Sequence, residues 1–270
     1  MTRLRDRLWL WGQSPGSHHR ESNNRYQLPG VNHMTPAEGC DFFGIPNCCR
    51  VVMENLPPPP FDPESEALKH LKQVVWSVVG SGGSSRTDAK LGDLEEVLDQ
   101  ARKYPNVTGG VLDDFLNARR RELFTPADVA LFRERMHQET GRRLDLWVVL
   151  YAHEISPEVK PYLEECDVVT FWTWHGRTLD RLEENLDTVI AMTPGKRHLA
   201  GCYMWNYGES KPLTPEQMKH QCEVYLRYVM DGKIEGIIFC SNCIADLGIP
   251  EVEWTRRWIA EHADQVVPEK

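Results

Sequence analysis

Two consecutive aspartates, Asp113 and Asp114, directly follow an apolar run at residues 107–112. Burial and the closeness of two carboxyl groups raise the pKa of at least one of them, which equips it as a proton donor. Because successive residues of a strand point in opposite directions, we expect one aspartate to face the interior and the other to turn toward a neighbouring loop or layer. The pair is therefore a candidate for acid–base chemistry. The structural alternative is that one aspartate caps the next turn or pairs with Arg119 or Arg120.

Glu154 and Glu209 follow two later apolar runs and are candidates to complement the aspartate pair. Hydrolysis of a glycosidic bond ordinarily needs two carboxyl groups, so the catalytic candidates are Asp113, Asp114, Glu154 and Glu209. The sequence leaves the choice between the two glutamates open. His153 is an alternative proton-handling group, in which case Glu154 is a solvated loop residue.

Tryptophans gather where the apolar runs end, at positions where a purely structural barrel more often uses aliphatic residues. Flat aromatic faces stack on the C–H faces of sugar rings, while Asn, Gln and carboxylate groups bind hydroxyls. The mixture predicts a neutral carbohydrate as the substrate. The predicted substrate-binding residues are Trp11, Gln13, His18, His153, Trp172, Trp174, Trp205, Tyr207 and Asn242.

The sequence supports a metal or redox site less well than it supports acid–base chemistry on a carbohydrate. Histidines 18, 19, 33, 153 and 175 could join Asp113 in a metal site, but the spacings H-x-H and H-E-x-x-H are absent. Cys240 and Cys243 have C-x-x-C spacing without the second pair of a zinc ribbon, and most of the eight cysteines lie in apolar runs. We therefore expect buried thiols, no bound metal and no cofactor.

Eight short apolar runs, each followed by a helical pattern or a helix-start signal, must position these side chains. Their near-continuous hydrophobicity is typical of parallel strands that are buried on both faces. The predicted strands are residues 7–12, 48–53, 73–79, 107–112, 144–151, 167–172, 198–205 and 235–240.

Helix starts are marked five times by an N-cap residue followed by proline. The N-cap residues are Thr35, Asp62, Thr125, Ser156 and Thr214, and the three threonines are followed by full or approximate capping boxes. The longest predicted helices span residues 88–103, 126–140, 179–192 and 215–231, and a last helix runs from 250 to about 262.

Eight strand–helix units in a row predict an α/β fold, a single (β/α)8 TIM barrel formed by one domain, residues 1–270. An open doubly wound sheet is the alternative, but no G-x-G-x-x-G loop follows the first strand. Three segments, residues 14–34, 57–60 and the glycine-rich 80–85, enlarge the rim at the carboxyl ends of the strands. We expect residues 80–85 to form a flexible loop at the active site.

Composition is that of an ordinary globular protein, with 41% hydrophobic and 26% charged residues. The net charge of −9 argues against nucleic acid or an anionic membrane as a partner. Arg119, Arg120 and Arg121 form the one basic run, which we expect to be a solvated helix face. No apolar stretch is long enough to span a bilayer and the N-terminus lacks the features of a signal peptide, so a cytoplasmic location is expected. The oligomeric state is not predicted.

The segments 111–115 (Val-Leu-Asp-Asp-Phe) and 205–209 (Trp-Asn-Tyr-Gly-Glu) resemble the strand endings of the (β/α)8 glycoside hydrolases. Many of these enzymes carry one catalytic acid after strand four and a second after strand five, six or seven. The resemblance implies a glycoside hydrolase that uses Asp113 or Asp114 together with Glu154 or Glu209. The Asn-Glu ending and the D-x-x-D-x-D-x-E pattern of particular families are absent, so no single family is indicated. The alternatives are a metal-dependent sugar isomerase or lyase and a non-catalytic carbohydrate-binding barrel.

Overall fold

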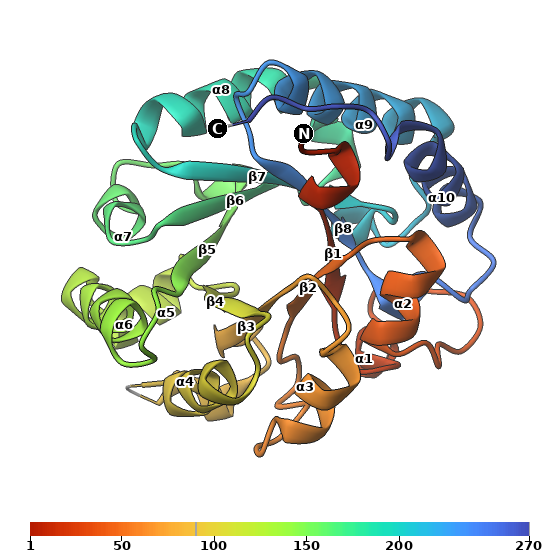
Figure 1. Cartoon of the computed structure of the whole chain (residues 1–270). Helices are drawn as coiled ribbons and strands as arrows, with labels where there is room; N and C mark the ends of the chain where they lie inside the picture. The colour runs from red at the N-terminus through yellow and green to blue at the C-terminus, as the bar shows by residue number, and fades with distance from the viewer. Residues whose placement is uncertain (90, 270) are drawn as a thin grey trace.

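Eight parallel strands close into a barrel in chain order in the computed structural model, which describes residues 1–89 and 91–269. Closure comes from β1, which pairs with β2 on one side and β8 on the other. The predicted (β/α)8 barrel is thus confirmed, and Figure 1 shows the helices on the outside of the strand ring. The strands are β1 (Leu8–Gly12), β2 (Asn47–Arg50), β3 (Gln73–Val79), β4 (Val107–Leu112), β5 (Asp145–Tyr151), β6 (Val168–Trp172), β7 (Arg197–Tyr203) and β8 (Gly236–Cys240).

The helices between the strands begin where the capping signals predict in most cases. All three threonine capping boxes are present, with the threonine side chain accepting from the third helical amide. The helices are α1 (Ser17–Arg20), α2 (Pro36–Phe43), α3 (Asp62–Leu68), α4 (Leu94–Lys103), α5 (Ala118–Leu123), α6 (Pro126–Gln138), α7 (Lys160–Glu164), α8 (Leu182–Met192), α9 (Pro215–Met230) and α10 (Pro250–His262).

Two of the five predicted helix starts are wrong. Asp62 is the first residue of α3 and Phe61 occupies the N-cap position, while the helix after Ser156 begins only at Lys160. The predicted helix 88–103 is also shorter, because Gly92 takes a left-handed φ of +51° beside the carbonyl of Val78 and α4 starts after it. Lys90, within that predicted helix, lies outside the described residues.

Two strands end earlier than the apolar pattern predicts. The predicted strand 48–53 leaves the sheet after Arg50, because the amide of Val52 bonds the hydroxyl of Ser77 at 2.9 Å instead of a strand carbonyl. The predicted strand 198–205 ends at Tyr203, and Trp205 lies in the following loop. Hydrophobicity alone does not separate a strand from a buried loop that continues it.

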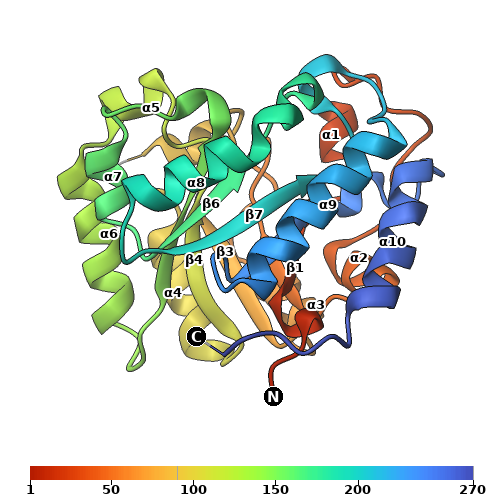
Figure 2. The same ribbon diagram turned by 90° about the horizontal axis from the view of Figure 1, so that it is seen from above.

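The two ends of the barrel differ in what covers them. Figure 2 shows both chain termini at one end, with α1 and α5 at the other. These two helices follow β1 and β4 directly, so they mark the face formed by the carboxyl ends of the strands. In barrels of this kind the loops on that face build the active site. Among the described residues, no helix is both long enough and apolar enough to cross a lipid bilayer.

Candidate active site

A cavity of about 530 Å³ opens at the carboxyl ends of the strands. This volume is within the range of small-molecule sites, roughly 300–1,000 Å³. Every strand, or the segment directly after it, contributes to the wall. One contribution per strand, in chain order, comes from Trp11, Met53, Ser81, Asp113, Tyr151, Trp174, Tyr203 and Cys240. We call this space the main cavity.

Asp113 and Asp114 both line the main cavity, although strand alternation predicts that they point apart. The difference arises because β4 ends at Leu112 and Asp114 has a left-handed φ of +46°. The alternation of side chains along a strand therefore does not extend to these two aspartates. The sharp turn brings both carboxyl groups to one hollow. Two acids from adjacent residues are therefore available to a single ligand.

The two aspartates differ in their surroundings. Burial, with the nearby charge of Asp114, raises the pKa of Asp113 well above its usual value, which favours the protonated form of this carboxyl group. The Arg120 charge and a hydrogen bond from the amide of Asp114 oppose this rise. Asp114 accepts hydrogen bonds from the Tyr151 hydroxyl at 2.7 Å and from the Gly82 amide at 2.8 Å. The two carboxyl groups therefore differ in burial and in hydrogen-bond partners.

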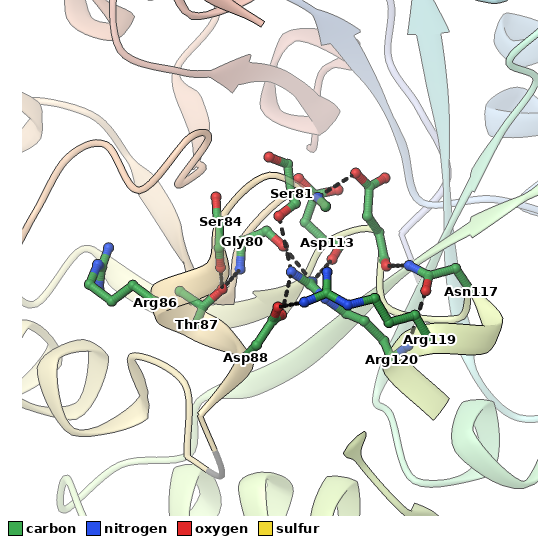
Figure 3. A network of polar contacts seen from close by, with 12 residues as sticks. Gly80, Ser81, Ser84, Arg86, Thr87, Asp88, Asp113, Asn117, Arg119 and Arg120 are labelled. Carbon is green, nitrogen blue, oxygen red and sulfur yellow. Dashed lines mark hydrogen bonds and ion pairs between the residues drawn. The ribbon is translucent and has the colours of Figure 1, made fainter. Parts of the chain in front are cut away.

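Arg120 fixes the backbone below this pair, as Figure 3 shows. Its guanidinium donates to the carbonyl oxygens of Gly80 at 2.6 Å, Asp113 at 2.7 Å and Ser81 at 3.0 Å, and it forms an ion pair with Asp88 at 3.0 Å. Only 1% of Arg120 is exposed, so the expectation that the whole basic run is a solvated helix face is wrong at this position. The buried cation ties the loop after β3 to the end of β4.

Aromatic rings form much of the wall. Of the predicted substrate-binding residues, Trp11, Gln13, His18, Trp174 and Tyr207 line the main cavity. Burial lowers the pKa of His18 to about 3, so its imidazole is neutral, and it shares a hydrogen bond of 3.0 Å with the Tyr207 hydroxyl. The wall therefore combines aromatic rings with neutral polar groups.

Three other predicted substrate-binding residues lie behind the wall rather than on it. Trp172 packs edge-on against Trp11, with ring centres 5.1 Å apart, and its indole N–H donates to Thr170. Trp205 donates to the carbonyl of Tyr26 at 3.1 Å. Asn242 bonds both backbone groups of Gln13, at 2.8 and 2.9 Å. They hold the lining residues in place and do not line the main cavity themselves.

Glycine at position 201 makes room for the indole of Trp172. A Cβ atom there would lie 1.9 Å from the indole ring, so only glycine fits.

The two glutamate candidates lie in different places. Glu209 lines neither the main cavity nor its neighbour; Lys211 and Arg177 form ion pairs with it, and Asn206 donates to it. The bond from Lys211 is the largest of the effects that lower the pKa of Glu209 to about 2. Glu154 and His153 line a smaller adjoining hollow that also reaches Asp114. Burial raises the pKa of Glu154 to about 7.

Several lining residues were not singled out from the sequence. Tyr151 and Tyr203 are the last residues of their strands, and in the sequence they resemble the other aromatic residues of the strands. Glu21, Arg25 and Tyr26 lie in the long segment after β1. That segment was expected to enlarge the rim, but its path depends on tertiary contacts. The predicted glycine-rich loop lines the main cavity through Ser81, Gly82 and Gly83. A strand-end position was the signal that could have identified both tyrosines.

In the described part of the chain, no group of three or more His, Cys, Asp or Glu side chains is arranged so that it could hold a metal ion. The eight cysteines are buried and free.

No protein-family model matches the sequence, and no curated protein matches it significantly. Solved structures with the same fold include a family 99 endo-α-mannosidase from Bacteroides thetaiotaomicron, with a TM-score of 0.58 and 9% identity over 95% of this chain and 97% of that one. A family 18 N-acetylglucosaminidase from Paenibacillus barengoltzii has a TM-score of 0.52 and 13% identity, covering 93% and 98%. The tryptophan synthase complex from Pyrococcus furiosus has a TM-score of 0.52 and 10% identity, over 97% of this chain and 98% of that one. The shared feature is the fold.

The expected resemblance to glycoside hydrolase barrels is therefore confirmed at the level of architecture. The tryptophan synthase structure matches with the same TM-score, 0.52, as the N-acetylglucosaminidase, so the reaction has to be argued from the site itself.

Proposed function

We propose that this protein hydrolyses a glycosidic bond in a neutral carbohydrate, with Asp113 as the proton donor and Asp114 as the carboxylate that stabilises the reacting centre. One observation carries the proposal. Two consecutive acids share the main cavity: burial raises the pKa of Asp113, and Asp114 accepts hydrogen bonds from Tyr151 and Gly82. Paired carboxyl groups with opposite tasks are the ordinary requirement of glycoside hydrolysis.

The reaction follows from these two roles. Asp113 gives its proton to the glycosidic oxygen as the bond between that oxygen and the anomeric carbon breaks. Asp114 stabilises the positive charge that develops on the anomeric carbon, and water supplies the oxygen of the new bond. A proton from that water restores the starting state of the pair. The Tyr151 hydroxyl holds Asp114 in place during the reaction.

The rest of the cavity suits a neutral polyhydroxylated ligand. Trp11, Trp174 and Tyr207 bring aromatic rings to the wall, and Trp174, the most exposed of the three, is the candidate for stacking on a sugar. Gln13 lines the cavity, and its buried Oε1 has no hydrogen-bond partner in the described part of the chain, so a substrate hydroxyl would satisfy it. Glu21 and Glu54 also line the cavity, where Arg25 pairs with Glu21 at 3.0 Å and Arg20 with Glu54 at 3.6 Å, so these charges compensate one another. The fold neighbours named as an endo-α-mannosidase and an N-acetylglucosaminidase agree with this substrate class.

A panel of 4-methylumbelliferyl glycosides, assayed with the wild type and with Asp113→Asn and Asp114→Asn, tests the proposal. Asp114→Asn should lose turnover of these aryl glycosides by a factor of about 10² or more. Asp113→Asn should show a loss of that size on the matching disaccharide, whose leaving group needs a proton that 4-methylumbelliferone does not. Glu209→Gln is the matched control, because Glu209 lines neither hollow. Full turnover in both aspartate variants would refute the assignment. Sugar binding by the wild type without any turnover would instead indicate a carbohydrate-binding barrel.

A further inference from the structure

A second hollow of about 250 Å³ adjoins the main cavity on the side of β5 and β6, and we call it the side recess. Asp113 belongs to the main cavity alone, and Asn117, His153 and Glu154 belong to the side recess alone. The two spaces share seven wall residues, Glu21, Arg25, Tyr26, Gly82, Asp114, Tyr151 and Trp174. Asp114 and Tyr151 therefore stand at the junction. A ligand longer than one small unit can pass this junction without leaving the protein surface.

The main cavity is closed below. Trp11, Gln13, Met53 and Cys240 line it and are at least 95% buried, so a sugar chain cannot continue through its floor. A substrate that enters with one terminal unit must extend outward, and the side recess lies next to the carboxylate pair. The wall geometry thus distinguishes an inner position from an outer one.

The side recess has its own binding surface. The exposed His153 ring stacks on Tyr151, with ring centres 5.4 Å apart and planes 11° apart. Burial lowers the pKa of His153, which keeps the imidazole uncharged at neutral pH. Glu154 is oriented by the amide of Tyr151, which donates to its Oε2 at 3.1 Å. A flat neutral ring beside a fixed carboxyl group is the same combination that suits a sugar in the main cavity.

Asn117 also lines the side recess, but its side chain is occupied. It caps α5 by accepting from the Arg120 amide at 3.0 Å, and it donates to the carbonyl of Asp114. Of the residues that line the side recess alone, His153 and Glu154 therefore remain to recognise a ligand.

We infer that the side recess binds the sugar unit that departs as the leaving group, with His153 as its stacking platform and Glu154 as its hydroxyl partner. This inference rests on the proposed function. The bond that is cleaved then spans the junction at Asp114, and the natural substrate is a disaccharide or a longer chain shortened from its end. His153 and Glu154 act in this reaction as specificity determinants and take no part in proton transfer to the glycosidic oxygen.

Paired substrates separate the leaving-group site from the chemistry. Once the glycoside panel has identified the sugar, the glycosyl fluoride of that sugar is compared with the matching disaccharide. The fluoride leaves as a single atom and does not reach the side recess. The variants are His153→Ala and Glu154→Gln, with Glu158→Gln as the matched control, because Glu158 is exposed and lines neither hollow.

For the disaccharide, His153→Ala should raise KM about threefold to tenfold, the loss expected when one stacked ring is removed. Glu154→Gln should also raise KM, and kcat should stay within about twofold in both variants. Hydrolysis of the glycosyl fluoride should be unchanged.

Three results would overturn the inference: an unchanged KM for the disaccharide in both variants, an equal loss on both substrates, or a fall in kcat alone, which would make Glu154 a proton donor. Failure of the proposed function looks different, since the wild type would then hydrolyse neither substrate.

Discussion

Arg119 and Arg120 offer a sharp test of what holds the loop after β3 against the end of β4, because both bind the carboxylate of Asp88. Arg119 donates to Asp88 Oδ2 at 2.7 Å with 63% of its side chain exposed, whereas Arg120 reaches Oδ1 at 3.0 Å with 1% exposed. Arg120 also donates to three buried carbonyl oxygens, and Arg119 makes no such bonds in the described structure. The change to methionine at each position removes the charge and keeps an unbranched apolar side chain.

The two substitutions should differ several-fold in their effect on the free energy of unfolding. Breaking a buried, hydrogen-bonded ion pair costs about 3–5 kcal/mol, which lowers the melting temperature of a protein of this size by roughly 6–20 °C. An exposed pair contributes about 0–1 kcal/mol, so Arg119→Met should shift the melting temperature by less than about 4 °C. The Arg120→Met variant should also lose turnover, because the end of β4 that carries Asp113 is no longer fixed.

Urea unfolding and thermal melts of both variants measure these effects, and a repeat in 1 M NaCl provides a control. Salt should remove the small contribution of Arg119 and leave that of Arg120 largely intact, since screening acts mainly on exposed charges. Equal losses of stability in the two variants would show that Arg120 is not a structural anchor. Normal turnover in a folded Arg120→Met variant would refute its positioning role.

Other predictions follow from the same contacts. Tyr151→Phe removes the hydroxyl that donates to Asp114 and should lower kcat/KM by about 10- to 100-fold, the value of one hydrogen bond to a charged group; an unchanged kcat/KM would count against this contact. Burial raises the pKa of Asp113, so the folded protein loses stability as the pH rises above about 3.8, the pKa of this carboxyl group in the unfolded chain. Asp113→Asn removes this cost and should therefore raise the melting temperature at pH 7, while turnover is lost. A lower melting temperature at pH 7 would contradict the burial argument. The pKa of Glu209 is instead lowered to about 2, so the stability that its charge contributes is lost as the pH falls from about 4.5 to 2. When unfolding is measured across this pH range, Glu209→Gln should lose less stability than the wild type.

The barrel could be predicted because its signals are local. Runs such as Gln73–Val79 and Val107–Leu112 are largely apolar on both faces, as strands of a sheet buried on both sides require. Their bounds are confirmed residue for residue. Threonine capping boxes gave three helix starts for the same reason. Ser156 failed as a signal because a proline after a capping residue also suits a turn, and the helix there starts four residues later.

The site was predictable only in part. Two carboxyl groups after an apolar strand are conspicuous, so Asp113 and Asp114 stood out. Glu209 also follows a strand, yet the contacts that occupy it come from Lys211, Arg177 and Asn206, and spacing along the chain does not show such pairings. The predicted substrate contacts of Trp172 and Trp205 were wrong for the same reason. A position at the end of a strand does not show whether an indole faces the cavity or packs behind its wall.

The two ends of the chain meet beneath the barrel, where the Leu4 amide donates to the carbonyl of Gln265 at 2.9 Å. Figure 2 places them on the opposite side from α1 and α5. A tether, tag or solid support attached through either end would therefore leave the mouth of the barrel unobstructed. Immobilised protein should still accept bulky polymeric ligands, and a short peptide joining the ends would yield a circular form with an open entrance.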